Sequence, residues 1–358
     1  MRELRRWRRA VGTAAGLAAV FALAGASPAA GAERTVAAGE SIQAAIDAAG
    51  PGDTITVAAG TYRENLRITT PDLTVRGAGA DQVVLEPPAA PSPAAKAADA
   101  CADVGICVAG TQDRPLTGVR IEALTVTGFA RYGIAGTGTD AMTVQGVRAD
   151  GNGQYGIGQQ KSVRGRLVGN AARDNGEAGI FLANTVDEEG GALDTQGAVV
   201  SGNALTGNKT GVVLRRVRNL TVQANAASGN CAGMFVVGDE GLPRAGHLSV
   251  RDNSVTDNTR YCPAGSRLPY VQGAGIVLTG VEDTTVERNT VAGNTGDSTM
   301  SGGVVFFRSF VGVPNTDNTV RDNVLASNGP ADIAGWDAGT GNSVTGNVCR
   351  VSLPAGRC

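Results

Sequence analysis

Short apolar runs separated by Asn and Gly dominate the chain from residue 121 to its end. The runs are about three to five residues long and alternate between apolar and polar positions, as short strands with one inward face do. Asn and Gly supply the left-handed backbone conformation that tight turns require. The pattern therefore predicts many short strands joined by turns, with no helix inside this region.

The strands and turns recur as one motif, Val-x-x-Asn-x-x-x-x-Asn, followed after a few residues by Gly and two or three apolar residues. Copies begin at Val200, Val222, Val250, Val286 and Val320, with a half-copy at Val344 and degenerate copies at Leu167, Val144 and Ile121. Without insertions the unit is about 22 residues long, a period that indicates a solenoid.

The composition of the unit selects the type of solenoid. Leucine-rich repeats have a similar period, but they need regularly spaced Leu and a helical segment, and both are missing here. An Asn at one position of every turn can stack into a ladder between coils, and parallel strands joined in one sense coil right-handed. We therefore predict an all-β fold, a single-stranded right-handed parallel β-helix of about ten coils. We expect Asn ladders through Asn203, Asn225, Asn253, Asn289 and Asn323.

Residues 1–32 have the composition of a signal peptide. A basic RRWRR segment precedes an apolar stretch from Ala10 to Ala24, and Ala30-Gly31-Ala32 fits a cleavage site. The apolar stretch is too short and too rich in Ala and Gly to favour a membrane anchor. The paired arginines leave general secretion and twin-arginine export both open. We expect residues 33–358 to form one secreted, extracellular β-helix domain with no membrane span.

A short helix is predicted just before the first coil. Ser41 can cap it, and Ile42 and Ile46 belong to an apolar stripe that continues to Ala49. Such a helix over residues 41–49 would cover the exposed end of the β-helix. This segment resembles the N-terminal cap of pectin-lyase-like right-handed β-helix proteins. With the Asn-ladder coils, the resemblance covers essentially the whole mature chain.

The resemblance implies the fold but leaves the reaction open. The superfamily includes lyases, hydrolases, epimerases, a copper-site maturation factor of the NosD type and members with no known chemistry. Composition limits the classes of molecule that the protein could bind. The formal net charge is −2 and aromatic residues make up 4% of the chain, and no basic stripe suits nucleic acid. We expect a monomer that does not bind nucleic acid.

The six cysteines form an even set in an exported chain, which predicts disulfides. The register of the repeat places Cys231 and Cys262 on the same edge of adjacent coils, so we predict that they pair. Two further pairs, Cys101–Cys107 and Cys349–Cys358, follow by elimination.

Insertions that break the period are the places where a solenoid acquires chemistry. Three of them, at residues 183–196, 238–247 and 307–317, follow alternate coils on one edge. Where Ile180 and its equivalents point inward, the next residue of each coil points outward. These outward residues are Phe181, Val213, Phe235, Val277 and Val305. An apolar row on an outer face requires a cover or a ligand. The insertion at residues 259–273 is one candidate cover, and a saccharide is the alternative occupant.

Charged residues accompany this face. Arg216 and Arg308 occupy the same position of coils three apart and are the candidate catalytic residues. The candidate substrate-binding residues are Phe181, Asn184, Asp187, Glu188, Phe235, Asp239 and Glu240. Pectate-lyase-type elimination uses carboxylates to bind Ca²⁺ and Arg or Lys as the base. The resemblance therefore makes Ca²⁺ the candidate cofactor. Lys209 follows a ladder Asn in a turn, and we do not expect it to act as a base.

This sequence lacks the residues that other reactions of the superfamily require. Polygalacturonase-type hydrolysis needs an Asp pair and Gly-His-Gly, whereas the one His, His247, lies in AGHLS. The Asp-Pro-His-Asp signature of mannuronan epimerases is missing, as are Met/His/Cys clusters suited to copper. We therefore expect a protein that binds or acts on extracellular polysaccharide, as a lyase of acidic glycans if it is catalytic. The alternative is a non-catalytic structural or glycan-binding protein of the cell envelope.

Overall fold

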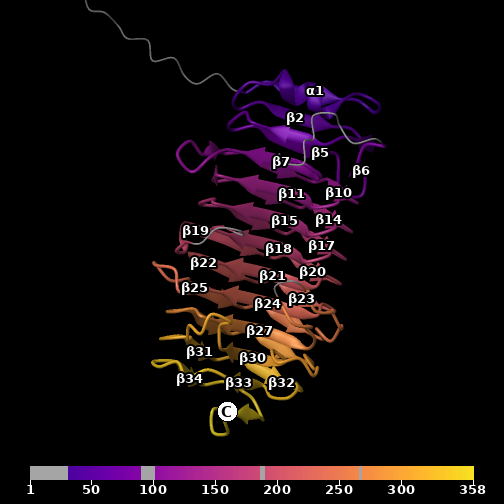
Figure 1. Ribbon diagram of the computed structural model, residues 1–358. Coiled ribbons are helices and arrows are strands. Elements are labelled where there is room, and N and C mark those ends of the chain that lie inside the picture. The colour runs from indigo at the N-terminus through magenta and orange to yellow at the C-terminus, as the bar shows by residue number, and fades with distance from the viewer. Residues whose placement is uncertain (1–30, 90–100, 186–189, 266–267) are drawn as a thin grey trace, which may run out of the picture. The chain divides into compact units, whose positions relative to one another are not determined.

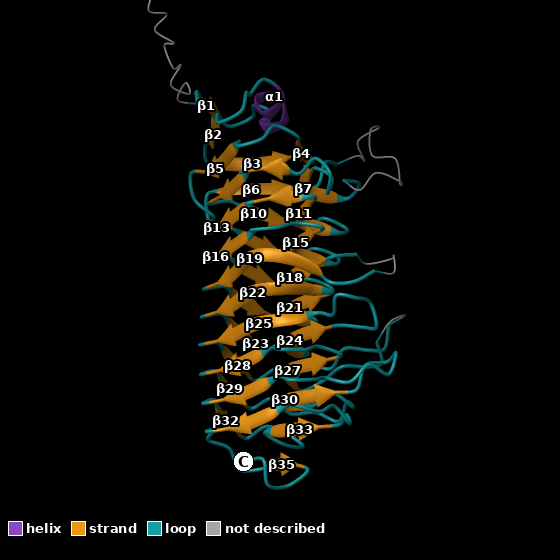
Figure 2. Ribbon diagram, turned by 90° about the vertical axis from the view of Figure 1, so that its left-hand side faces the viewer, coloured by secondary structure: helices purple, strands orange, loops and turns teal. Residues whose placement is uncertain are grey.

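The computed structural model describes residues 31–89, 101–185, 190–265 and 268–358, and residues 31–358 form one compact unit. Within this unit the chain winds through three parallel sheets, and each regular coil contributes one short strand to each sheet (Figure 1 and Figure 2). The structure confirms the predicted right-handed parallel β-helix of about ten coils. Among the described residues, no helix has the length and apolar composition needed to span a membrane.

Sheet A contains twelve strands. In spatial order they are β1 (Glu33–Val36), β2 (Thr54–Val57), β5 (Thr74–Gly77), β9 (Arg120–Glu122), β13 (Thr143–Gln145), β16 (Arg166–Val168), β19 (Leu193–Ser201), β22 (Val217–Gln223), β25 (Gly246–Arg251), β28 (Thr285–Glu287), β31 (Thr319–Arg321) and β34 (Ser343–Thr345).

Sheet B contains ten strands. They are β3 (Gly60–Arg63), β6 (Val83–Glu86), β10 (Thr125–Thr127), β14 (Arg148–Asp150), β17 (Ala171–Arg173), β20 (Ala204–Thr206), β23 (Ala226–Ser228), β26 (Ser254–Thr256), β29 (Thr290–Ala292) and β32 (Val324–Ala326).

Sheet C contains eleven strands, each beginning near the repeated Gly in the regular coils. They are β4 (Leu66–Ile68), β7 (Val104–Ala109), β11 (Tyr132–Thr137), β15 (Tyr155–Gln160), β18 (Ala178–Ala183), β21 (Thr210–Arg215), β24 (Ala232–Val237), β27 (Ala274–Thr279), β30 (Gly302–Phe307), β33 (Ile333–Gly335) and β35 (Ser352–Leu353). A small extra sheet pairs β8 (Leu116–Thr117) with β12 (Thr139–Asp140).

The predicted helix is present as α1 (Ile42–Asp47), shorter at its C-terminal end than expected. The Ser41 side chain accepts a hydrogen bond from the amide of Ala44, as an N-cap does. Ile42 and Ile46 are buried in the core. Figure 1 places α1 next to the first coils. Its role in closing the coil stack stays a prediction.

Two Asn ladders run through the interior. The predicted ladder is confirmed, because the Asn225 side chain donates to Asn253 Oδ1 at 3.0 Å and accepts from Asn203 Nδ2 at 2.8 Å. It spans Asn170, Asn203, Asn225, Asn253, Asn289, Asn323 and Asn347. A second ladder spans Asn152, Asn175, Asn208, Asn230, Asn258, Asn294 and Asn328. Each Asn between the two ends of a ladder thus bonds to the coil before it and to the coil after it, which satisfies backbone groups that water does not reach.

Close approach of adjacent coils explains the repeated Gly. A Cβ at Gly156 would lie 2.7 Å from the carbonyl oxygen of Gly179 and 2.9 Å from Asn175 Nδ2. Both distances are shorter than van der Waals contact, so the start of β15 has no room for a side chain at this position.

All three predicted disulfides form: Cys231–Cys262, Cys101–Cys107 and Cys349–Cys358. The Cα atoms of Cys231 and Cys262 are 5.9 Å apart, within the usual range for a disulfide. Disulfides persist in oxidising compartments, so the three bonds indicate such a compartment for this protein.

Candidate functional site

The outer face of sheet C carries a groove with a volume of about 890 Å³, within the roughly 300–1,000 Å³ range of protein ligand sites. Its lining begins at Tyr132 on β11 and ends at Phe307 on β30, six coils further along. Coils stack about 4.8 Å apart, so the groove extends over about 29 Å. This length suits an extended ligand better than a single small molecule.

The floor of the groove is the outward row of sheet C. Ile180 and Met234 lie in the main core, whereas the residues that follow them, Phe181 and Phe235, belong to separate clusters outside it. The predicted alternation is therefore confirmed. Four members of the predicted row, Phe181, Val213, Phe235 and Val277, line the groove.

The insertion at residues 259–273 covers part of this row. Leu268 and Val271 pack in the cluster that contains Phe235 and Val277, and the Cys231–Cys262 bond holds the insertion against the coil before it. Val277 is completely buried, while Val213 is only half-buried. The insertion thus covers one stretch of the row and leaves another open, and a saccharide as the occupant of the open stretch stays a prediction.

An aromatic ladder forms one end of the groove. The rings of Tyr132 and Tyr155 have centroids 4.8 Å apart, and those of Tyr155 and Phe181 are stacked at 4.3 Å. Gly158 makes room for the ladder, because a Cβ there would lie 2.5 Å from Tyr132 Cε1. Stacked rings of this kind form a rigid apolar wall. Gln160 Nε2 donates to the Tyr132 hydroxyl at 2.9 Å and fixes its orientation.

Charged residues line the two edges of the groove. Arg131 lies over the ring of Tyr132, with 5.6 Å from Cζ to the ring centroid, and Lys209 pairs with Glu177 at 3.1 Å. Arg215 lies on the opposite edge at the end of β21. Among the described residues, the lining contains four basic residues, Arg131, Lys209, Arg215 and Arg216, and two acidic residues, Glu177 and Asp239.

Arg216 and Asp239 form a buried ion pair at the edge of the groove. Arg216 Nε donates to Asp239 Oδ2, and the two side chains are 8% and 14% exposed. Arg216 Nη1 also donates to Thr185 Oγ1 at 3.3 Å, and Asp239 Oδ1 accepts from the amide of Gly241 at 3.0 Å. The pair therefore fixes the loop after β24 to the preceding coil. It also argues against Asp239 as a calcium ligand, because a guanidinium already occupies the carboxylate.

The other predicted site residues lie in several places. Arg308 and Glu240 are exposed, Asn184 is half-buried, and none of the three is among the residues that line the groove. Asn184 Nδ2 donates to the carbonyl of Gly191 at 2.7 Å, and this bond holds together two residues of the insertion at 183–196. Asp187 and Glu188 lie outside the described residues. The structure thus brings together Phe181, Phe235, Arg216 and Asp239 at the groove, and their roles stay predictions.

Sequence reasoning missed two prominent residues of the lining, Tyr132 and Tyr155. The two tyrosines precede the repeated Gly at the same position of consecutive units, as the pairing of Tyr132 with Tyr155 shows. Such an aromatic repeat next to an outward apolar row was the available signal. Lys209, which the sequence placed in a turn, lines the groove, and that it does not act as a base stays a prediction.

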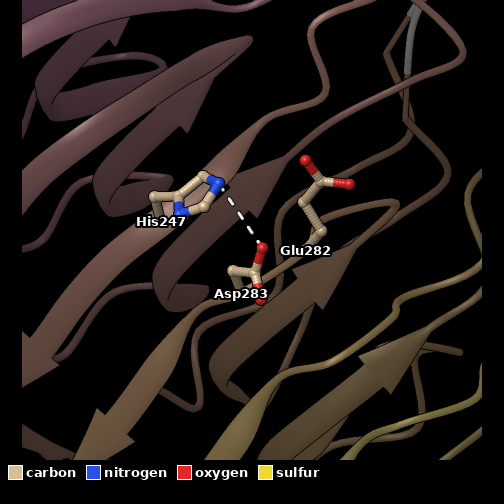
Figure 3. A group of neighbouring side chains, drawn as sticks. All are labelled: His247, Glu282 and Asp283. Atoms are coloured by element: carbon tan, nitrogen blue, oxygen red, sulfur yellow. Dashed lines mark ion pairs between the residues drawn. The ribbon is translucent and has the colours of Figure 1, made fainter.

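A second cluster of polar residues lies where strands of sheet A begin, with His247 in β25 and Glu282 and Asp283 just before β28 (Figure 3). The ligand atoms of His247, Glu282 and Asp283 fall within 4.8 Å of one another, and His247 Nε2 is 3.4 Å from Asp283 Oδ2. The Glu282 carboxylate also lies 3.7 Å from Arg244 and 4.0 Å from Arg218. These two guanidinium groups balance the two carboxylates and oppose a further cation, so the cluster is better described as an ion-pair network.

Two family models match the chain. The model described as "Right handed beta helix region" matches residues 98–255, and the model described as "Periplasmic copper-binding protein (NosD)" matches residues 183–350. The comparison with curated protein sequences gives no match.

Solved structures share the fold at low sequence identity. The Dettilon tailspike protein is 15% identical over 83% of this chain and 60% of its own, with a TM-score of 0.56. The A-module of the Azotobacter vinelandii mannuronan C-5 epimerase AlgE6 is 17% identical over 88% and 95%, with a TM-score of 0.50. A tailspike double mutant of E. coli bacteriophage HK620, in complex with a pentasaccharide, is 12% identical over 83% and 55%, with a TM-score of 0.52. This chain thus spans about 60% of the Dettilon tailspike, and these similarities show the fold alone.

Proposed function

We propose that this right-handed parallel β-helix is a secreted protein whose groove on sheet C binds an extracellular anionic polysaccharide. The observation that carries the proposal is the groove itself. It is about 890 Å³ in volume, extends over several coils and combines an aromatic wall with basic side chains at both edges.

The chemistry of the lining supports this class of ligand. Polysaccharides present apolar C–H faces between rows of hydroxyl groups, and aromatic and aliphatic side chains such as Tyr155 and Val213 offer matching surface. Carboxylates along an acidic polymer would pair with Arg131 and Arg215 on opposite edges of the groove. A mannuronan epimerase and a pentasaccharide-bound tailspike among the structural neighbours are consistent with this assignment.

Bond cleavage is not part of the proposal. Arg216, one candidate base for β-elimination, is buried in its ion pair with Asp239, and Arg308, the other, lies outside the groove lining. A guanidinium held by a carboxylate of the adjacent loop is not placed to take a proton from a bound sugar. The groove therefore favours the glycan-binding alternative over the lyase.

The NosD family description raises copper binding as a second function, and the residues do not fit it. All six cysteines are in disulfides. Met142 and Met234 are buried in the main core, and Met300 is buried in the cluster under the insertion. Copper sites in proteins draw on thiolate, thioether and imidazole ligands. His247 has two carboxylates beside it instead, so we assign no copper function.

The test is co-sedimentation of the secreted protein with a panel of uronate polymers and with neutral dextran, at low and high salt, with and without Ca²⁺. We expect binding to uronate polymers that weakens with salt. Arg131→Ala and Arg215→Ala should each weaken it by about tenfold or more, the usual cost of a charge-assisted hydrogen bond. Arg166→Ala is the matched control, since Arg166 is exposed on sheet A.

Absorbance of unsaturated products in the same samples tests for cleavage. If unsaturated products form and Arg216→Ala abolishes them, the result would support the lyase interpretation over the binding protein. Failure to bind any uronate polymer, or equal effects of Arg215→Ala and Arg166→Ala, would contradict the proposed function.

A further inference from the structure

The described lining of the groove changes in chemistry along the coil stack. Its two tyrosines, its two glutamines and its four basic residues all come from the coils of β11, β15, β18 and β21. The coils of β24, β27 and β30 contribute apolar side chains, among them Phe235, Val237, Val277, Phe307, Phe310 and Val311. Thr279 and Ser309 are the hydroxyl-bearing residues of these last coils in the described lining, and Ser309 is buried. Asp239 is their one charged residue there, and its carboxylate is already paired with Arg216. The groove therefore has a polar half and an apolar half.

The apolar half presents exposed side chains on an anchored loop. Phe310 and Val311 are 64% and 58% exposed. The ring of Phe310 packs against that of Phe307 with centroids 5.5 Å apart. The loop is tied to the next coil, because the amide of Asn315 donates to Asp337 Oδ2 at 2.9 Å. Exposed apolar side chains that are held in this way mark a contact surface.

The insertion at residues 259–273 forms the opposite wall of the apolar half. It precedes β27, whereas the loop that carries Phe310 follows β30, so the two segments rise from opposite edges of sheet C. Leu268 of the insertion lines the groove, and the Cys231–Cys262 bond holds the insertion in place. The apolar half is thus a channel between two fixed walls, and from β24 to β30 it extends over about 10 Å.

We propose that the groove binds a glycolipid, meaning a saccharide that carries one alkyl or acyl chain at its end. The sugar lies over β11 to β21, and the chain lies over β24 to β30. This inference rests on the proposed function and adds an apolar end to its ligand. The ring of Tyr155 contacts the C–H surface of the sugar, and the glutamines and charged side chains of the same coils offer hydrogen bonds to its hydroxyl groups. The methylene groups of the chain leave water and contact Val237, Phe307 and Phe310.

The change along the lining argues against a ligand of uniform chemistry. A bare polysaccharide repeats the same polar groups along its length, so over the apolar half these groups would lose water and gain few partners. A free fatty acid would cover the apolar half and leave the polar coils without contacts. A ligand with one polar end and one apolar end matches both halves, and this match does not depend on the net charge of the lining.

The experiment is calorimetry of the secreted protein with a uronate hexasaccharide and with the same hexasaccharide carrying an n-octyl group at its reducing end, below its critical micelle concentration. Each methylene group that the groove buries should tighten binding about fourfold, so three buried methylene groups should give a gain of about sixtyfold. The double variant Phe310→Ser/Val311→Ser should reduce this gain by about tenfold, because it removes apolar contact area. Val324→Ser, at an exposed valine of sheet B, is the control and should retain the gain.

Equal affinity for the two hexasaccharides would overturn the glycolipid inference and leave the proposed function standing, whereas no binding of either would overturn both. Binding of the octyl form alone, weakened in the double variant, would support the inference and show that the chain is required for tight binding. A gain that the double variant retains in full would place the chain outside this groove and overturn the inference. Sodium octanoate probes the chain without the sugar, and octanoate binding as tight as that of the octyl hexasaccharide would identify a fatty-acid site and also overturn the inference.

Discussion

Buried Asn side chains connect the coils of this β-helix more specifically than its aliphatic core does. Asn225 is 1% exposed and bonds to Asn203, Asn253 and the carbonyl of Val200. An aliphatic residue in the same place would contribute packing but would leave these partners unsatisfied in a site without water. The repeated Asn in the sequence was therefore sufficient to predict the ladder, because few side chains can form hydrogen bonds with both neighbouring coils at once.

Asn225→Ala should destabilise the protein by about 3 kcal/mol, since it leaves buried donors and acceptors on Asn203 and Val200 without partners. Denaturant unfolding measures the change. Asn347→Ala is the control, because Asn347 ends the same ladder in a half-buried position where water can replace its bonds. Equal losses in the two variants would contradict the account of the ladder.

Ionisation of Asp53 makes the stability of the first coil depend on pH. Its carboxylate accepts a hydrogen bond from the amide of Gly50 at 2.9 Å and pairs with Arg34 at 3.1 Å, and these contacts, which remain after cleavage at Ala32, lower the pKa of Asp53. Because the pKa is lower in the folded chain, the ionised carboxylate stabilises the fold above the unfolded value of about 3.9. The contribution is lost as the pH falls through the lowered folded pKa.

Asp53→Asn should therefore flatten the loss of thermal stability on acidification below about pH 4. Melting temperatures between about pH 6 and 2 test this, with Asp47→Asn as the control, since Asp47 is exposed at the end of α1. A wild-type and an Asp53→Asn curve that stay parallel through this range would refute the assignment.

At the scale of elements, the regular coils could be predicted and the irregular ones only located. The period of the repeat gave the strands of sheets A, B and C from β13 onward, because each coil repeats the same contacts. Strand β1 was missed, since only Val36 of its four residues is buried and the segment shows little pattern. The insertion at residues 259–273 was located by counting, but its packing over Phe235 depends on side chains that follow no period.

The Cys231–Cys262 disulfide should matter most for this insertion. The bond closes a separation of 31 residues, and the chain-entropy model assigns about 3–4 kcal/mol to a loop of this length. The double variant Cys231→Ala/Cys262→Ala should make the insertion sensitive to limited proteolysis and weaken polymer binding. The double variant Cys349→Ala/Cys358→Ala is the control, as it lies at the chain end. Cleavage at the same rate in both would contradict this role.

At the scale of the whole molecule, the sequence predicted which residues face outward at the groove but not the composition of the rest of its lining. Alternation along each strand placed Phe181 and Phe235 on the outside of sheet C, and both line the groove. The position of a charged residue next to a strand end is less determined, because loop geometry decides it. Arg216 therefore lies at the groove edge, whereas Arg308, its equivalent three coils on, does not.

The structure of the secreted protein in complex with a uronate hexasaccharide tests the central claim most directly. We predict that the oligosaccharide lies along the outer face of sheet C, with carboxylates at Arg131 and Arg215 and sugar rings against Tyr155 and Val213. An oligosaccharide bound on sheet A, on sheet B or at the end of the coil stack, with this groove left empty, would contradict the account.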